Sequence, residues 1–224
     1  MIFSADTWQV TLFSIAVGLA STLVILPFGI TLAWLFARKE WPLKSLFETI
    51  VLLPLVMPPV STGLILLKIF GRRSPLGQWL YQMGFEIVFN WKGVLIAMAV
   101  MSFPLLVRSV RISFAEVNPR LEQIAATLGA SPLKIFFVVT VPLAYKGIVA
   151  GALLAFSRAL GEFGATILLA GNIPGRTQTL SLAIYNFVQL GKDPEAYVLL
   201  GITVVLAFLF VWTSEWLLRT EKKV

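Results

Sequence analysis

The chain has 224 residues, of which 58% are apolar and 13% are charged, and its formal net charge is +7. A soluble domain carries about 25% charged residues, so this composition excludes a soluble enzyme, a disordered protein and a fibrous protein, and predicts an integral membrane protein. The sequence contains no Cys and no His. This excludes disulfides, thiolate or imidazole metal sites and catalysis by either side chain, and no metal site is expected.

Five stretches are apolar and long enough to cross a bilayer, which takes about 20 residues of helix. A further apolar segment, 165–171, is too short to cross and is predicted to be re-entrant or to lie at the surface. The chain is therefore predicted to be all-α, a polytopic membrane protein forming one domain over residues 1–224. The predicted spans cover residues 10–37, 47–69, 90–112, 135–160 and 196–217.

Basic residues indicate the orientation of these spans, because Lys and Arg collect in cytoplasmic loops. With five spans, the first loop, the third loop and the C-terminal tail share one side of the membrane. That side is predicted to be cytoplasmic, with the N-terminus outside and the C-terminus inside. Its basic residues are Arg38, Lys39, Lys44, Arg108, Arg111, Arg120, Lys134, Arg219, Lys222 and Lys223.

The second span contains Pro54, Pro58 and Pro59. Each proline removes a backbone donor, so the three together interrupt the helix in mid-membrane. The freed carbonyl groups must be satisfied by protein or by a water-lined cavity. Either this bend lines a transport pathway or packing alone fixes the kink. Ser61 and Thr62 follow it and offer neutral hydroxyl donors of the kind that a dehydrated oxyanion can use.

A short amphipathic helix is predicted within the cytoplasmic loop, residues 116–134. Asn118 is a suitable N-cap, Pro119 suits the first helical position, and Gly129 suits a left-handed C-cap. The apolar residues between them recur at helical spacing and form one face. Such a helix either lies on lipid headgroups or docks into a groove of a partner protein. The face comprises Leu121, Ile124, Ala125 and Leu128.

Arg158 and Glu162 lie four residues apart near the external end of the fourth span. On a continuous helix they share a face and can form an ion pair. Ionisable residues at membrane depth are costly and often functional, although a local pair near the interface is the simpler alternative. A structural or gating role is favoured over direct substrate binding, because a paired Arg binds an anion less well.

The cytoplasmic loop resembles the coupling loop of ABC-importer permeases, whose pattern is E-A-A, three residues, Gly, nine residues and I-x-L-P. The spacing from Gly129 to Pro142 fits this pattern. Gln123 and Ile124 replace the usual Glu and the first Ala, and two Val residues replace the Ile and the Leu. These changes keep the helical phase.

The resemblance extends over almost the whole chain and is strongest to the permeases of molybdate importers. Sulfate and thiosulfate permeases share the run 161–165 and much of the coupling loop. The runs similar to the molybdate permeases are Ser102-Phe103-Pro104-Leu105, Leu121-Glu122-Gln123, Thr127-Leu128-Gly129-Ala130, Gly161-Glu162-Phe163-Gly164-Ala165-Thr166 and Asn172-Ile173-Pro174-Gly175.

The resemblance implies a type I importer permease of the bacterial inner membrane. Two copies would form the pathway for a tetrahedral oxyanion, most simply molybdate. Two cytoplasmic ATPase subunits would bind the coupling helices, and an external binding protein would deliver the ion. ATP with Mg²⁺ belongs to the ATPase partner, because this chain lacks a G-x-x-x-x-G-K-[ST] sequence. The chain itself is not expected to be an enzyme or to bind a cofactor.

Two alternative functions remain: a sulfate or thiosulfate permease, and a channel or secondary transporter. The absence of a visible internal repeat weakens the last of these. The expected ATPase-coupling residues are Arg120, Leu121, Glu122, Gln123, Ile124, Ala125, Leu128 and Gly129. The pathway or gate candidates are Pro54, Pro58, Pro59, Ser61, Thr62, Ser102, Arg158, Glu162 and Thr166.

Overall fold

The structure is a computed structural model that describes residues 5–221, and this part of the chain is all-α, as the sequence predicts. In chain order the helices are α1 (Ala5–Arg38), α2 (Lys44–Val56), α3 (Pro59–Phe70), α4 (Pro75–Gln82), α5 (Trp91–Glu116), α6 (Pro119–Thr127), α7 (Pro132–Ile135), the π-helix η1 (Phe136–Thr140), α8 (Val141–Leu160), α9 (Gly164–Leu169), α10 (Leu180–Gln189) and α11 (Asp193–Glu221).

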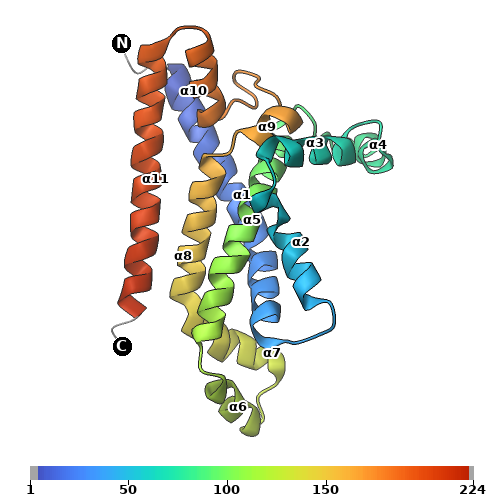
Figure 1. Cartoon of the computed structure of the whole chain (residues 1–224), viewed down its shortest axis with the longest axis vertical. Helices are drawn as coiled ribbons and strands as arrows, with labels where there is room; N and C mark the ends of the chain where they lie inside the picture. Colours follow the sequence, from blue (N-terminus) through green and yellow to red (C-terminus); the bar gives the residue numbers. More distant parts are fainter. Residues whose placement is uncertain (1–4, 222–224) are drawn as a thin grey trace.

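Three long helices, α1, α5 and α8, run side by side through the centre of the molecule (Figure 1). The short helices α6 and α7 lie at one end of this bundle, hereafter the α6 end. Helices α3, α4, α9 and α10 lie at the other, hereafter the α10 end (Figure 1). Because α1 begins at the α10 end and α11 runs back toward the α6 end, the chain crosses the bundle an odd number of times (Figure 1).

The core of the bundle consists of side chains from the faces that α1, α5 and α8 turn toward one another. Phe114 of α5 and Phe156 of α8 are almost fully buried there. Small residues bring α5 and α8 close together, and a Cβ built on Gly147 would overlap the hydroxyl of Ser113. Helix α11 packs against α8 and α10, and Ser214 donates to the Ala150 carbonyl at 3.0 Å.

Among residues 5–221, four helical segments are long and apolar enough to cross a membrane: 7–38, 91–116, 132–160 and 193–219. The predicted second span, 47–69, differs from a simple span, because α2 and α3 meet at a bend of 111°. Met57 is extended (φ −70°, ψ 147°), and Pro58 and Pro59 follow it, so no helical hydrogen bond is available to carry the ladder across. The break therefore lies at the prolines where the sequence predicts an interruption of the helix.

The apolar segment 165–171 does not cross the bundle. It forms α9, a helix of six residues that packs against α3 and α5 and that includes the fully buried Ala165 and Leu169. It is therefore an internal element of the protein. Of the two predicted placements, re-entrant or at the surface, the surface placement is wrong. Both neighbours are apolar where they meet it, which explains why so short a segment is as hydrophobic as a span.

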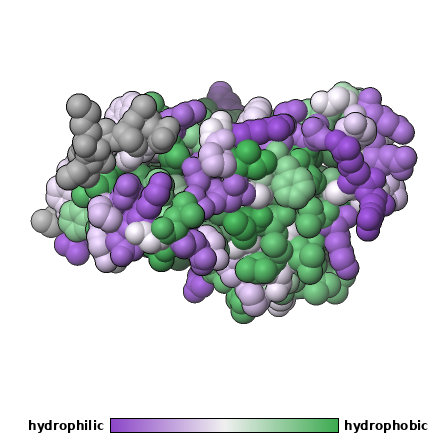
Figure 2. All heavy atoms as spheres, turned by 90° about the horizontal axis from the view of Figure 1, so that it is seen from above, coloured by the Kyte–Doolittle hydropathy of each residue, from purple (hydrophilic) through white to green (hydrophobic). Residues whose placement is uncertain are grey.

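The outer surface of the bundle is rich in exposed apolar side chains, as expected for a face in contact with lipid. Phe28 of α1 and Phe208 of α11 are examples, each about two-thirds exposed. Hydrophilic side chains gather instead at the edge of the α10 end on the α4 side, which Figure 2 shows in a view onto that end.

Candidate functional site

Helix α6 is capped at both ends by the residues that the sequence singles out. The Asn118 side chain accepts a hydrogen bond from the Arg120 N–H at 3.0 Å, and Pro119 occupies the first turn. Gly129 has φ +84°, and the Ala130 N–H reaches back to the Ala125 carbonyl at 3.0 Å. This is the left-handed C-cap that favours Gly, because a side chain at positive φ strains the backbone. The predicted helix and both of its caps are confirmed.

The apolar face of α6 is uncovered within the part of the chain that the structure describes. Leu121, Ile124 and Leu128 are 44%, 55% and 82% exposed, and Ala125 between them is half-buried. Arg120 is exposed beside this face, and Gln123 is exposed on the opposite side of the helix. Because the helix projects from the α6 end of the bundle (Figure 1), a partner can reach these residues without any rearrangement.

Glu122 is the exception among the expected coupling residues, because its carboxylate is held inside the chain. Its Oε1 atom lies 3.2 Å from Arg38 Nε and accepts a hydrogen bond from the Thr140 hydroxyl at 2.8 Å. Arg38 also donates from Nη2 to the Val117 carbonyl at 2.7 Å. The sequence analysis did not predict that Arg38 and Thr140 bind Glu122. The one available signal was helical phase, because Glu122 lies about 100° around the helix from Leu121 and so points away from the centre of the apolar face.

The second candidate region surrounds the break between α2 and α3. Pro54 lies within α2, Pro58 caps α3 and Pro59 begins it. Ser61 is half-buried and Thr62 is 6% exposed. Within residues 5–221 the Thr62 hydroxyl has no hydrogen-bond partner, which is unusual for a buried polar group.

Arg158 and Glu162 form the ion pair that their spacing predicts, with Arg158 Nη2 2.7 Å from Glu162 Oε2. The Glu162 side chain is 1% exposed, although α8 already ends at Leu160. Its other oxygen accepts the Ala165 N–H at 2.8 Å and so caps the start of α9. One carboxylate therefore holds the end of α8 and the beginning of α9 together.

An open pocket of about 550 Å³ brings this ion pair next to the proline break. Pro59 and Val60 of α3 line one side, and Arg158 and Glu162 line the other. Two distant parts of the sequence thus meet, as a pathway or a gate requires. Other candidates lie outside its lining: Pro54, Pro58, Ser61, Thr62, Ser102 and Thr166.

Ser102 and Thr166 lie deep in the protein. Ser102 is fully buried in α5 and donates to the Met98 carbonyl of its own helix at 2.7 Å, so its hydroxyl faces the core. Thr166 of α9 is also fully buried, and its hydroxyl lacks a hydrogen-bond partner among the described residues. The structure therefore does not bring Ser102 to the pocket.

Helices α3 and α9 are in close contact at two Gly residues beside this pocket. A Cβ built on Gly63 would lie 2.8 Å from the Ala165 Cα, and one built on Gly164 would lie 2.8 Å from the Pro59 Cβ. Both distances are shorter than packed carbon atoms allow. The two Gly residues are therefore required for this contact.

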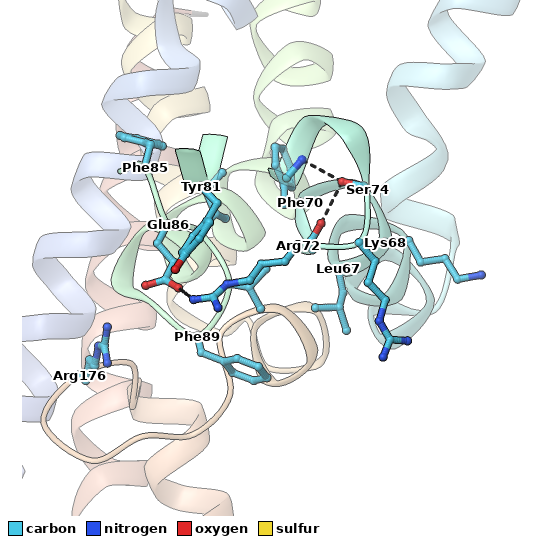
Figure 3. A pocket seen from close by; sticks show the side chains of 15 residues that line it. Leu67, Lys68, Phe70, Arg72, Ser74, Tyr81, Phe85, Glu86, Phe89 and Arg176 are labelled. Atoms are coloured by element: carbon cyan, nitrogen blue, oxygen red, sulfur yellow. Dashed lines mark hydrogen bonds and ion pairs between the residues drawn. The ribbon is translucent and has the colours of Figure 1, made fainter. Parts of the chain in front are cut away.

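A larger pocket of about 920 Å³ lies at the α10 end, between α3, α4 and the loop before α5. Figure 3 shows Arg72 at its centre, paired with Glu86, and Arg176 on the loop that follows α9. The Arg72 guanidinium also lies over the Tyr81 ring, 4.0 Å from its centroid. The pKa of Arg72 is raised, chiefly because the Glu86 carboxylate accepts its hydrogen bond, so this cation does not titrate in any physiological range. Sequence reasoning missed this pocket, because its residues come from separate loops.

The sequence matches a known family model, described as "Binding-protein-dependent transport system inner membrane component", over residues 7–219. It is 44% identical to "Molybdenum transport system permease protein ModB" of Escherichia coli (strain K12), covering 100% of this chain and 98% of that protein. The ModB protein of Haemophilus influenzae is also 44% identical, over 94% of this chain and 93% of its own length. "Sulfate transport system permease protein CysT" of Salmonella typhimurium is 34% identical, over 83% and 67%.

Solved structures support the fold. A bacterial alginate ABC transporter in complex with an alginate-bound periplasmic protein has a chain that matches with a TM-score of 0.72 at 17% identity, over 94% of this chain and 77% of that one. The inward-facing MetNI methionine ABC transporter matches with a TM-score of 0.68 at 19% identity, over 98% and 99%. By sequence and by fold, the chain belongs to the family of inner membrane components of binding-protein-dependent transport systems.

Proposed function

We propose that this chain is the permease subunit of an ATP-driven importer whose substrate is molybdate. The observation that carries the proposal is the 44% identity over the full chain to permeases named for molybdenum transport. The sulfate permease relative is less similar and aligns over less of its length, so sulfate or thiosulfate is the second candidate. A channel or secondary transporter has no need for an exposed, capped helix beyond the bundle, whereas a permease driven by an ATPase needs one.

Helix α6 is the proposed contact with the ATPase. Its exposed apolar face needs a cover, and Arg120 is the one cation within α6. A helix lying on lipid headgroups favours several cations along its polar face. A groove in a partner protein is therefore the better cover. Because the chain lacks a P-loop sequence, ATP and Mg²⁺ are assigned to that partner, and this chain is assigned no cofactor or metal.

The proposed complex contains two copies of this chain, two ATPase subunits and an external oxyanion-binding protein. The alginate transporter, a neighbour in fold, is described with a periplasmic protein, which supports such an arrangement. The pathway is proposed to pass the proline break. Pro59, Arg158 and Glu162 line it there, and the buried hydroxyls of Thr62 and Thr166, which have no hydrogen-bond partner among the described residues, are proposed as donors that become available on opening.

The substrate assignment is tested by uptake. When the permease is reconstituted in vesicles with its ATPase and its binding protein, we expect uptake of radiolabelled molybdate that requires ATP. We expect unlabelled molybdate or tungstate to compete with it and a tenfold excess of sulfate to leave it nearly unchanged. Uptake that sulfate abolishes and that molybdate does not would instead identify a sulfate permease. Uptake that persists without ATP would contradict the ABC assignment.

The proposed orientation in the inner membrane places the α6 end in the cytoplasm and the N-terminus outside, because three basic regions lie toward that end. Ser45, at the start of α2, and Gln189, at the end of α10, are exposed at opposite ends of the bundle. The sequence has no Cys, so Ser45→Cys and Gln189→Cys each carry a unique thiol. In intact cells, a membrane-impermeant maleimide should label only the Gln189→Cys variant. Labelling of Ser45→Cys alone would reverse the orientation.

A further inference from the structure

Three side chains from separate parts of the chain meet beneath α6. Glu122 contributes its carboxylate, Arg38 its guanidinium and Thr140 its hydroxyl, at the distances given above. The Arg38 and Glu122 side chains are only 12% and 19% exposed, and Thr140 is 1% exposed. A pair that water reaches so little is far less screened than a surface ion pair. We call these three residues the Glu122 clamp.

Little else fixes α6 to the bundle. No residue of α6 is buried by the described part of the chain, and the helix packs mainly against the short elements α7 and η1. Within residues 5–221, Glu122 is also the one side chain of α6 that hydrogen bonds to another element. The position of α6 therefore depends on this carboxylate far more than on apolar packing.

The clamp connects α6 to all three central helices. Arg38 is the last residue of α1, and its second hydrogen bond goes to Val117, directly after α5. Thr140 is the last residue of η1, which continues directly into α8. A π-helical turn at this point is itself a marker, because such turns are uncommon and often lie at functional sites. A force applied to α6 thus reaches α1, α5 and α8 through one group of polar contacts.

We propose that Glu122 is a positioning residue, which holds α6 rigidly to the bundle so that movement of the bound ATPase is passed to the central helices. The proposal rests on the assignment of α6 as the ATPase contact, but it gives Glu122 a role different from that of the exposed coupling residues. Ile124 and its neighbours bind the partner, whereas Glu122 faces away from it and binds Arg38. Without the clamp, α6 pivots on its flanking turns and the ATPase turns over without moving the permease.

The attachment itself is measured without any partner. A spin label on an Ala126→Cys variant reports the mobility of α6, since Ala126 is exposed and the chain has no other Cys. We expect Glu122→Gln and Arg38→Gln each to convert the spectrum from a restricted to a mobile form in the purified permease. Glu116→Gln is the matched control, because Glu116 is an exposed carboxylate at the end of α5, and it should leave the spectrum unchanged. An unchanged spectrum in both clamp variants would overturn the proposal.

The mechanical role is measured in the reconstituted transporter as the number of ions imported per ATP hydrolysed. We expect each clamp variant to keep its ATPase on co-purification and to lower this ratio about fivefold or more, the lower end of the usual coupling between two sites. The double variant Arg38→Gln/Glu122→Gln should be no worse than the worse single variant, because both changes break one interaction. Since it leaves no charge unpaired, it also keeps the test valid if a single variant folds poorly.

The outcomes separate the clamp from the proposed function. If wild-type uptake does not depend on ATP while the spin label becomes mobile in both variants, the clamp stands as an attachment and the transport assignment fails. If Glu122→Gln loses the ATPase while Arg38→Gln behaves as wild type, Glu122 is a docking residue and the clamp proposal is wrong. The clamp proposal would also be contradicted if the double variant lowered the number of ions imported per ATP by the product of the two single effects.

Discussion

Replacing Ile124 by Asp is expected to leave the permease in the membrane and to abolish its association with the ATPase. Ile124 is 55% exposed, so a carboxylate at this position costs the isolated permease little. In the complex the same carboxylate would be buried against an apolar groove without a partner, which costs several kcal/mol. Loss of a central apolar anchor alone costs about 2 kcal/mol, or roughly 30-fold in affinity. Co-purification of the ATPase with the tagged permease measures the effect.

The matched control is Ala126→Asp, which introduces the same charge on the side of α6 away from the apolar face. It should keep the ATPase bound and should transport normally. If Ile124→Asp also keeps ATPase association and ATP-dependent uptake, α6 is not the coupling element.

A second pair of variants tests whether the C-cap of α6 sets the direction in which the chain leaves this helix. Within the described chain, nothing lies within 4 Å of a Cβ built on Gly129, so the cost of a side chain comes from the positive φ alone. Gly129→Val should therefore cost about 1–2 kcal/mol and redirect the chain after α6. Gly129→Asn, whose residue tolerates this conformation, should retain most of the uptake. Equal uptake by the two variants would show that transport does not depend on the left-handed conformation at Gly129.

Glu162→Ala is expected to destabilise the permease strongly and to abolish uptake. The substitution leaves Arg158 without its counter-ion and the Ala165 N–H without its acceptor. Breaking a buried ion pair by removing one partner costs about 3–5 kcal/mol, so the midpoint of thermal unfolding in detergent should fall by roughly 6–20 °C. The control Glu195→Ala, at an exposed carboxylate in the first turn of α11, should lower it by only about 1–3 °C.

A double variant distinguishes a gate from a purely structural pair. Arg158→Gln/Glu162→Gln removes both charges and keeps hydrogen-bonding side chains, so it should recover most of the lost stability. If the pair lines and gates the pathway, uptake of molybdate by the double variant should stay low although the protein is stable. Full recovery of uptake together with stability would leave the pair a structural role only.

Local signals predicted local structure well. The caps of α6, the break at Pro58 and Pro59 and the Arg158–Glu162 pair all depend on residues a few positions apart, where backbone geometry decides the outcome. The 111° angle of the break was not predictable. It depends on how α3 packs against α9, about 100 residues later in the chain.

Contacts between distant residues explain what the sequence did not reveal. Arg38 and Glu122 are 84 positions apart, and no pattern in either segment indicates that they meet. The pocket around Arg72 likewise needs three loops in their folded places. Ser102 lies within a run shared with the molybdate permeases, and resemblance alone does not reveal that its hydroxyl bonds to its own helix.

The backbone contact between α3 and α9 has a mechanical consequence. Where two helices meet through flexible side chains, rotamer changes let one slide over the other. At Gly63 and Gly164 the contact is made by backbone atoms and by the rigid ring of Pro59, with no space left for a Cβ, so α3 and α9 are expected to move as one unit. Beside the pocket, the two non-helical links that could absorb such a movement are the extended Met57–Pro58 link and the turn at 161–163. A movement that widened the pocket between Pro59 and Arg158 would therefore carry α3 and α9 together, so its width and the tilt of both helices would change in one step.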